Sequence, residues 1–141
     1  MKTTEEIDKK LLAAWIVALT ATLGALFIGE VLGKAPCSLC WHQRIFMFPI
    51  AIILTLGLWW NDHTVERYAL ALASPGVVLA AWHLGLYWEV VPKPAIPCSA
   101  TGTSCSGEDQ AVLGVPIALM SLAAFIMIAV LSALSAMENR K

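Results

Sequence analysis

The four cysteines of this 141-residue chain fall into two pairs. Cys37 and Cys40 are separated by two residues, the spacing of dithiols that interconvert readily with a disulfide. Cys98 and Cys105 form the second pair. Because a thiolate that attacks a disulfide sulfur passes on an oxidising equivalent, two neighbouring pairs can work in sequence. These four residues are therefore the candidate catalytic residues of a thiol-disulfide relay.

The surroundings of the first pair favour a reactive thiolate. Cys40 lies near the predicted start of an apolar helix, where unpaired backbone N-H groups and the helix dipole stabilise an anion. Arg44 follows one turn later and shares a helix face with Cys40 if the helix has begun by then. Both effects should lower the pKa of the Cys40 thiol from its unperturbed value of about 8.5. A cation at the edge of hydrocarbon is costly, so Arg44 is a functional candidate; snorkelling, or an ion pair with Glu30, is the alternative.

Four apolar stretches must position these cysteines, at residues 11–32, 44–60, 68–88 and 112–137. The chain is 59% hydrophobic and 13% charged, which lies outside the usual range of soluble domains. Each stretch reaches or approaches the about 20 residues that a bilayer crossing requires. The first is too long for the apolar core of a cleaved signal peptide, which is about 7 to 15 residues. The sequence therefore predicts an all-α, integral membrane four-helix bundle that forms a single domain over residues 1–141.

The distribution of cations predicts the orientation of this bundle. Six lie on the side of the two termini and the middle hinge and three on the other: Lys2, Lys9, Lys10, Arg67, Arg140 and Lys141 against Lys34, Arg44 and Lys93. Positive residues concentrate on the cytoplasmic side. Both termini are therefore predicted to be cytoplasmic and both cysteine hinges to lie on the outer face. The net charge of -1 carries no information about partners, and no basic patch suggests nucleic acid.

Structural roles for the cysteines compete with the relay. A Cys98–Cys105 bridge would stabilise a loop by about 2.5 kcal/mol in the chain-entropy model, but it leaves Cys37 and Cys40 unexplained. A four-cysteine zinc site needs closer spacing than the second pair has, and an oxidising exterior favours disulfides, so no metal is predicted. The alternative function is a non-enzymatic membrane assembly protein with structural disulfides. Export of reducing power would be favoured by cysteines within the spans, whereas these lie at the hinges.

The run from Cys37 to Arg44, Cys-Ser-Leu-Cys-Trp-His-Gln-Arg, resembles the Cys-x-x-Cys-x-x-x-Arg signature of the bacterial disulfide bond formation protein B family, DsbB and its short relatives called BdbC. The four spans, the second cysteine pair and the Leu-Gly-Val-Pro run at 113–116 are also similar. The resemblance implies a quinone-linked thiol-disulfide oxidoreductase of the bacterial cytoplasmic membrane. It would reoxidise an extracytoplasmic, DsbA-like thiol oxidase of the thioredoxin fold and pass the electrons to ubiquinone or menaquinone.

The resemblance also implies roles for the cysteines. Cys98 would form the mixed disulfide with the partner protein, and Cys105 would then attack Cys37. Cys40 would be the sulfur beside the quinone. The second pair is more closely spaced than in the enterobacterial form with its longer outer loop, and is more like the BdbC branch. The order of the exchanges therefore stays open.

Two further residues are implied as quinone ligands. Arg44 would hold a quinone oxygen and stabilise negative charge. His83, toward the outer end of the third stretch, looks like the histidine that the family places near the quinone. Its alternative is a structural histidine near the interface. Gln43 stands where an acidic residue also occurs in the family, and no proton role is predicted for it.

Overall fold

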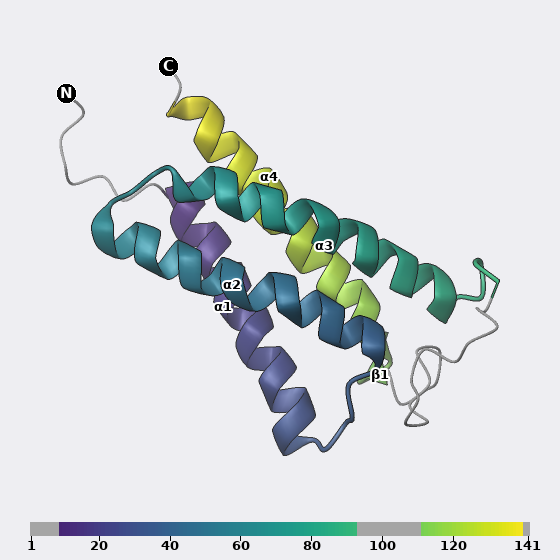
Figure 1. Ribbon diagram of the computed structural model, residues 1–141. Helices are drawn as coiled ribbons and strands as arrows, with labels where there is room; N and C mark the ends of the chain where they lie inside the picture. Colours follow the sequence, from purple (N-terminus) through teal and green to yellow (C-terminus); the bar gives the residue numbers. More distant parts are fainter. Residues whose placement is uncertain (1–8, 93–110, 140–141) are drawn as a thin grey trace.

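A computed structural model describes residues 9–92 and 111–139. In these ranges the chain is an all-α bundle (Figure 1). Its elements are α1 (Lys9–Leu26), the π-helix η1 (Phe27–Val31), α2 (Ser38–Trp60), α3 (Val65–Tyr87), β1 (Ala111–Val112), β2 (Val115–Pro116) and α4 (Ile117–Glu138). Four of the helices, α1 continued by η1, α2, α3 and α4, are long and apolar enough to cross a membrane. The predicted fold class is confirmed.

Two helix starts differ from the predicted stretches by five residues or more. The second stretch was predicted from residue 44, but α2 begins at Ser38, after Cys37 as its N-cap. The fourth was predicted from residue 112, but α4 begins only at Ile117. There the backbone takes positive φ at Leu113 (53°) and Gly114 (80°), which turns the chain between β1 and β2 before the helix starts. Hydropathy misses the start of α2 because residues 38–43 are mixed in character, and it carries no signal for the positive φ angles that delay α4.

Small residues let the helices approach closely. Lipid-facing helices gain little from the hydrophobic effect, so membrane bundles depend on close packing of backbones and side chains. In α1, Ala14 and Ala18 are fully buried, and α3 buries a similar row of alanines. Gly76 of α3 faces Phe125 of α4, so closely that a Cβ there would lie 2.3 Å from the ring. The α3–α4 contact therefore depends on the absence of a side chain at Gly76.

One end of the bundle is held by polar contacts. Glu66 of α3 is almost fully buried and accepts hydrogen bonds from Ser135 Oγ (2.6 Å) and Asn139 Nδ2 (2.8 Å), both at the end of α4. Lys10 and Glu138 form an ion pair at 2.6 Å between the start of α1 and the end of α4. Figure 1 shows the turn between α2 and α3 at this same end, and the start of α2 at the other. The first cysteine pair therefore lies at the end opposite to this polar network.

The close approach at Gly76 gives the first prediction. Gly76→Ala should lower the free energy of unfolding by about 1 to 3 kcal/mol, because the new methyl group overpacks against the buried ring of Phe125. Gly24→Ala is the control, since a Cβ at Gly24 meets nothing within 4 Å and alanine favours the helix. Denaturant titration in detergent measures both variants. Equal stability of the two would contradict this account of the α3–α4 contact.

Candidate functional site

Cys37 and Cys40 meet at the start of α2. Cys37 is the N-cap of the helix in extended backbone, and its sulfur accepts a hydrogen bond from the backbone N-H of Cys40 (3.4 Å). The two sulfur atoms lie 3.1 Å apart, with Cys37 Sγ donating to Cys40 Sγ. Both residues are buried. The thiol pair is therefore part of the helix cap, as predicted from its position near a helix N-terminus.

The surroundings of Cys37 stabilise its protonated form. The hydrogen bond to Cys40, followed by burial, raises the pKa of the Cys37 thiol from its ordinary 9.0 to about 12, while the contact with His83 acts in the opposite direction. Cys37 therefore keeps its proton at neutral pH, and Cys40 Sγ accepts the hydrogen bond from that thiol.

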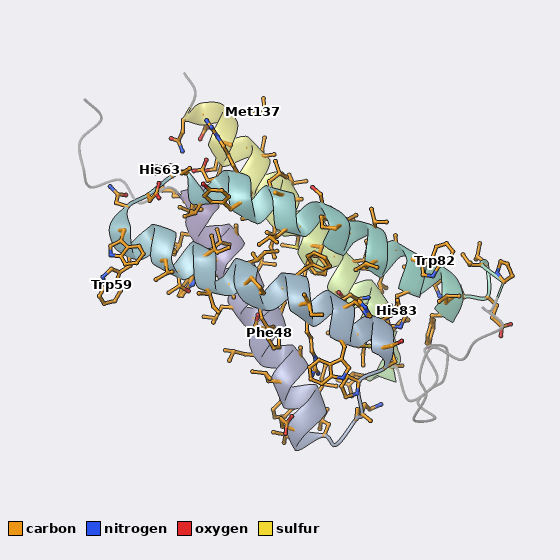
Figure 2. The ribbon with its side chains drawn as sticks, in the orientation of Figure 1. Phe48, Trp59, His63, Trp82, His83 and Met137 are labelled. Atoms are coloured by element: carbon orange, nitrogen blue, oxygen red, sulfur yellow. The ribbon has the colours of Figure 1, made fainter. Side chains whose placement is uncertain are left out.

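His83 contacts the thiol pair from α3. It is fully buried on α3, with Nε2 3.8 Å from Cys37 Sγ and Nδ1 3.0 Å from Nε2 of the buried Gln43. Figure 2 shows the His83 ring directed toward α2, whereas its neighbour Trp82 lies on the outer side of α3. The sequence analysis named both His83 and Gln43 but did not predict the contact between them. Because Gln43 is three residues after Cys40, it shares the helix face of the thiol, and this spacing was the available signal.

A cavity of about 470 Å³ lies on the other side of Cys40, between α1, α2 and α4. Most of its walls are apolar, and include Ile16, Val17, Met47, Phe48, Met120 and Ala124. Its polar lining includes Cys40, Gln43, Arg44 and Lys34. His83 is not among the lining residues, so the predicted role of His83 as a cofactor ligand stays a prediction. Nothing in the sequence indicated that α1 and α4 would supply the apolar walls.

Arg44 is fixed by the backbone of the first helix. Its Nη2 donates to the carbonyl of Ala25 at 2.8 Å, and its guanidinium carbon lies 5.3 Å from the ring centre of Trp41. A Cβ on Gly29 would lie only 3.1 Å from Nη2, so the guanidinium rests against the backbone of η1. π-Helical turns occur often at functional sites. Arg44 shares a helix face with Cys40, as predicted, and no ion pair joins it to Glu30 in the described chain.

Lys34 connects the cavity to the last loop. Its Nζ donates to the carbonyl of Ala111 in β1 at 2.7 Å. The described residues stop at Pro92 and resume at Ala111. The end of α3 and β1, on either side of this gap, lie at the end of the bundle where α2 begins (Figure 1). Cys98 and Cys105 lie outside the described residues, and their roles stay predictions.

Comparisons with known proteins agree with this arrangement. The family described as "Disulfide bond formation protein DsbB" matches residues 8–135. A "Probable disulfide formation protein" of Metapseudomonas resinovorans is 53% identical over 122 residues, which cover 86% of this chain and 85% of that protein. "Disulfide bond formation protein C" of Bacillus subtilis is 37% identical over 119 residues, 84% of this chain and 86% of that protein. No solved structure matches the chain.

The contact between Gln43 and His83 gives the second prediction. Gln43→Leu should lower the free energy of unfolding by about 1 to 3 kcal/mol, because His83 Nδ1 would lose its partner in a buried position. The control is His42→Leu, one residue earlier, where an exposed ring is removed and the change should stay within about 0.5 kcal/mol. Denaturant titration compares the two variants. Equal losses would show that the buried contact contributes nothing specific.

Proposed function

The chain belongs to the DsbB family of disulfide bond formation proteins, and from this premise we propose that it is a quinone-linked thiol-disulfide oxidoreductase. Thiol oxidation by a multi-pass membrane protein is the chemistry of the family. The finer proposal is that the protein reoxidises a DsbA-like thiol oxidase outside the bacterial cytoplasmic membrane and passes the electrons to ubiquinone or menaquinone. The observation that supports it best is Cys40 in the wall of an apolar cavity beside Arg44.

The cavity suits a quinone. Its volume falls within the about 300 to 1,000 Å³ of ordinary ligand pockets. Apolar side chains such as Met47 and Met120 match a ring and a prenyl tail, while the cations of Arg44 and Lys34 would hold the ring oxygens. When bound, a quinone supplies a lipid-soluble acceptor for two electrons and two protons. The residues present therefore fit this cofactor.

The helix start determines where charge develops during exchange. Attack by Cys105 on the sulfur of Cys37 breaks the Cys37–Cys40 bond and leaves the electron pair on Cys40. Cys40 lies in the first turn of α2, where backbone N-H groups and the helix dipole stabilise an anion. The Arg44 guanidinium, one turn later on the same face, adds a permanent positive charge. The leaving group is thus the sulfur that lines the cavity.

Cys37 is stabilised by a different set of groups. Attack by Cys98 on Cys105 would re-form the Cys98–Cys105 bond and release the Cys37 sulfur as a thiolate. Nε2 of His83 and the backbone N-H of Cys40 both face that sulfur and would stabilise its charge. Gln43 orients the His83 ring through Nδ1. A bound quinone would supply the acceptor for the two electrons that re-forming the Cys37–Cys40 bond sets free.

The proposed orientation places the thiol pair on the outer face. The end of α3 and β1, which flank the segment with Cys98 and Cys105, lie at the same end as the start of α2 (Figure 1). The opposite end, with the Glu66 network, would be cytoplasmic together with both termini. A soluble partner outside the membrane could then reach the second pair.

The third prediction tests the function itself. Cys40→Ser should abolish the quinone-dependent reoxidation of a reduced DsbA-like protein, because Cys37 then has no partner for its bond. Quinol formation is followed by absorbance with the purified full chain. Ser38→Ala, at the neighbouring first position of α2, is a control that should keep turnover. Turnover retained in Cys40→Ser would refute the relay, and four unreactive cysteines in the unaltered chain would favour the assembly role.

The fourth prediction concerns the cation in the cavity. Arg44→Gln should raise the KM for quinone by about tenfold or more, because a charge-assisted hydrogen bond contributes about 1.5 to 3 kcal/mol. The bond between Cys37 and Cys40 should still form. Arg67→Gln, an exposed cation at the far end of the bundle, is the control. An unchanged KM in Arg44→Gln would remove Arg44 from the quinone site.

A further inference from the structure

The reduced thiol pair and His83 form a compact set of metal ligands. One ligand atom each from Cys37, Cys40 and His83 lies within 4.8 Å of the other two, and all three residues are buried. Two thiolates and an imidazole suit zinc and cadmium. We propose that this trio, with both cysteines reduced, binds a divalent cation of the zinc class. The set differs from the four-cysteine zinc site considered from the sequence, since it uses one cysteine pair and a histidine from α3.

The distances are close to those of a tetrahedral site. Zinc-sulfur bonds of about 2.3 Å and zinc-nitrogen bonds of about 2.05 Å imply separations of about 3.8 Å between sulfurs and about 3.5 Å between sulfur and nitrogen. Cys37 Sγ lies 3.1 Å from Cys40 Sγ and 3.8 Å from His83 Nε2. Small movements of the side chains would therefore place these three ligands at three of the four positions of a tetrahedral site.

The groups around the ligands are those that a metal site needs. Histidine ligands usually bind a polar group through their other nitrogen, and His83 Nδ1 contacts the amide of Gln43 at 3.0 Å. An amide offers a donor and an acceptor, so when Gln43 turns its oxygen toward Nδ1-H, Nε2 is left as a ligand facing Cys37. The backbone N-H of Cys40 also stabilises a thiolate on Cys37.

Charge balances when the cation binds. The two thiols release two protons to solvent, the cation takes their place, and no electron is transferred. The resulting complex of one divalent cation, two thiolates and a neutral imidazole has no net charge, so Arg44 does not repel it strongly. Because Cys40 lines the cavity, the fourth coordination position can be taken by water from that side.

Binding would depend on the redox state. A Cys37–Cys40 disulfide has no thiolate to offer, so only the reduced site binds the cation. While the cation is bound, neither sulfur can take part in thiol-disulfide exchange, so turnover would stop. This inhibition depends on the proposed function, whereas metal binding itself depends only on the geometry of the three residues.

Cadmium titration tests the site directly. The full chain carrying Cys98→Ser and Cys105→Ser, reduced and kept anaerobic, should bind one Cd²⁺ with a thiolate charge-transfer band in the ultraviolet and release two protons. His83→Ala should weaken Cd²⁺ binding at least about tenfold, and Gln43→Leu by about 10- to 100-fold. The control is His42→Ala, which replaces an exposed histidine on α2 and should bind Cd²⁺ as tightly as the parent chain does.

Three results would overturn the inference. The first is equal Cd²⁺ affinity in His83→Ala and the parent chain, which would indicate a chelate of the two sulfurs alone. The second is a loss of binding when Cys98 and Cys105 are replaced. The third result applies if the His83 variant fails to fold. It is a failure of Zn²⁺, in the fully reduced natural sequence, to protect Cys37 and Cys40 from alkylation while Cys98 and Cys105 react.

The natural sequence, assayed both for Cd²⁺ binding and for quinone-dependent turnover, separates this inference from the proposed function. Quinone-dependent turnover of the natural sequence without Cd²⁺ binding would reject the metal site alone. Stoichiometric Cd²⁺ binding without any quinone-dependent turnover would reject the quinone-linked function and leave the metal site intact.

Discussion

The capped start of α2 is the constraint on which the rest of the site depends. Cys37 must stay outside the helix for its sulfur to accept the Cys40 N-H, and this holds both thiols at the end of an apolar helix. From that start, the spacing of an α-helix puts Cys40, Gln43 and Arg44 on one face. One face thus presents a sulfur and a cation to the cavity and an amide to His83. A shift of the helix start by one residue would take the Cys37 sulfur away from the backbone N-H of Cys40.

Much of this arrangement follows from the sequence. The apolar stretches predicted four long helices because hydrophobic length is a strong signal in a membrane chain. Helix spacing predicted that Cys40 and Arg44 share a face, since four residues make about one turn. Two predicted membrane crossings separate the two cysteine pairs, so both pairs were predicted to lie at the same end of the bundle. The end of α3 and β1, which flank the second pair, do lie at the end of the bundle where α2 begins (Figure 1). The positions of Cys98 and Cys105 themselves fall outside the described residues.

What the sequence left undetermined depends on contacts between distant segments. The pairing of Gln43 with His83 joins α2 to α3, and neither residue type alone indicates it. Arg44 is supported by the carbonyl of Ala25 in α1 and by the π-helical turn that contains Gly29, and hydropathy carries no signal for that turn. The cavity is formed by three helices whose mutual rotation depends on close packing of small residues. The buried Glu66 network likewise appears only when α3 and α4 are placed side by side.

The most direct test is an anaerobic titration of the fully reduced chain with oxidised quinone, with alkylation of the remaining thiols mapped by mass. The account predicts that each quinone consumed removes two thiols, and that without a partner protein Cys37 and Cys40 are the first to resist alkylation. Quinone-dependent loss of the Cys98 and Cys105 thiols in a Cys40→Ser chain, whose first pair cannot form a disulfide, would contradict it, because the electrons would then leave from the wrong pair.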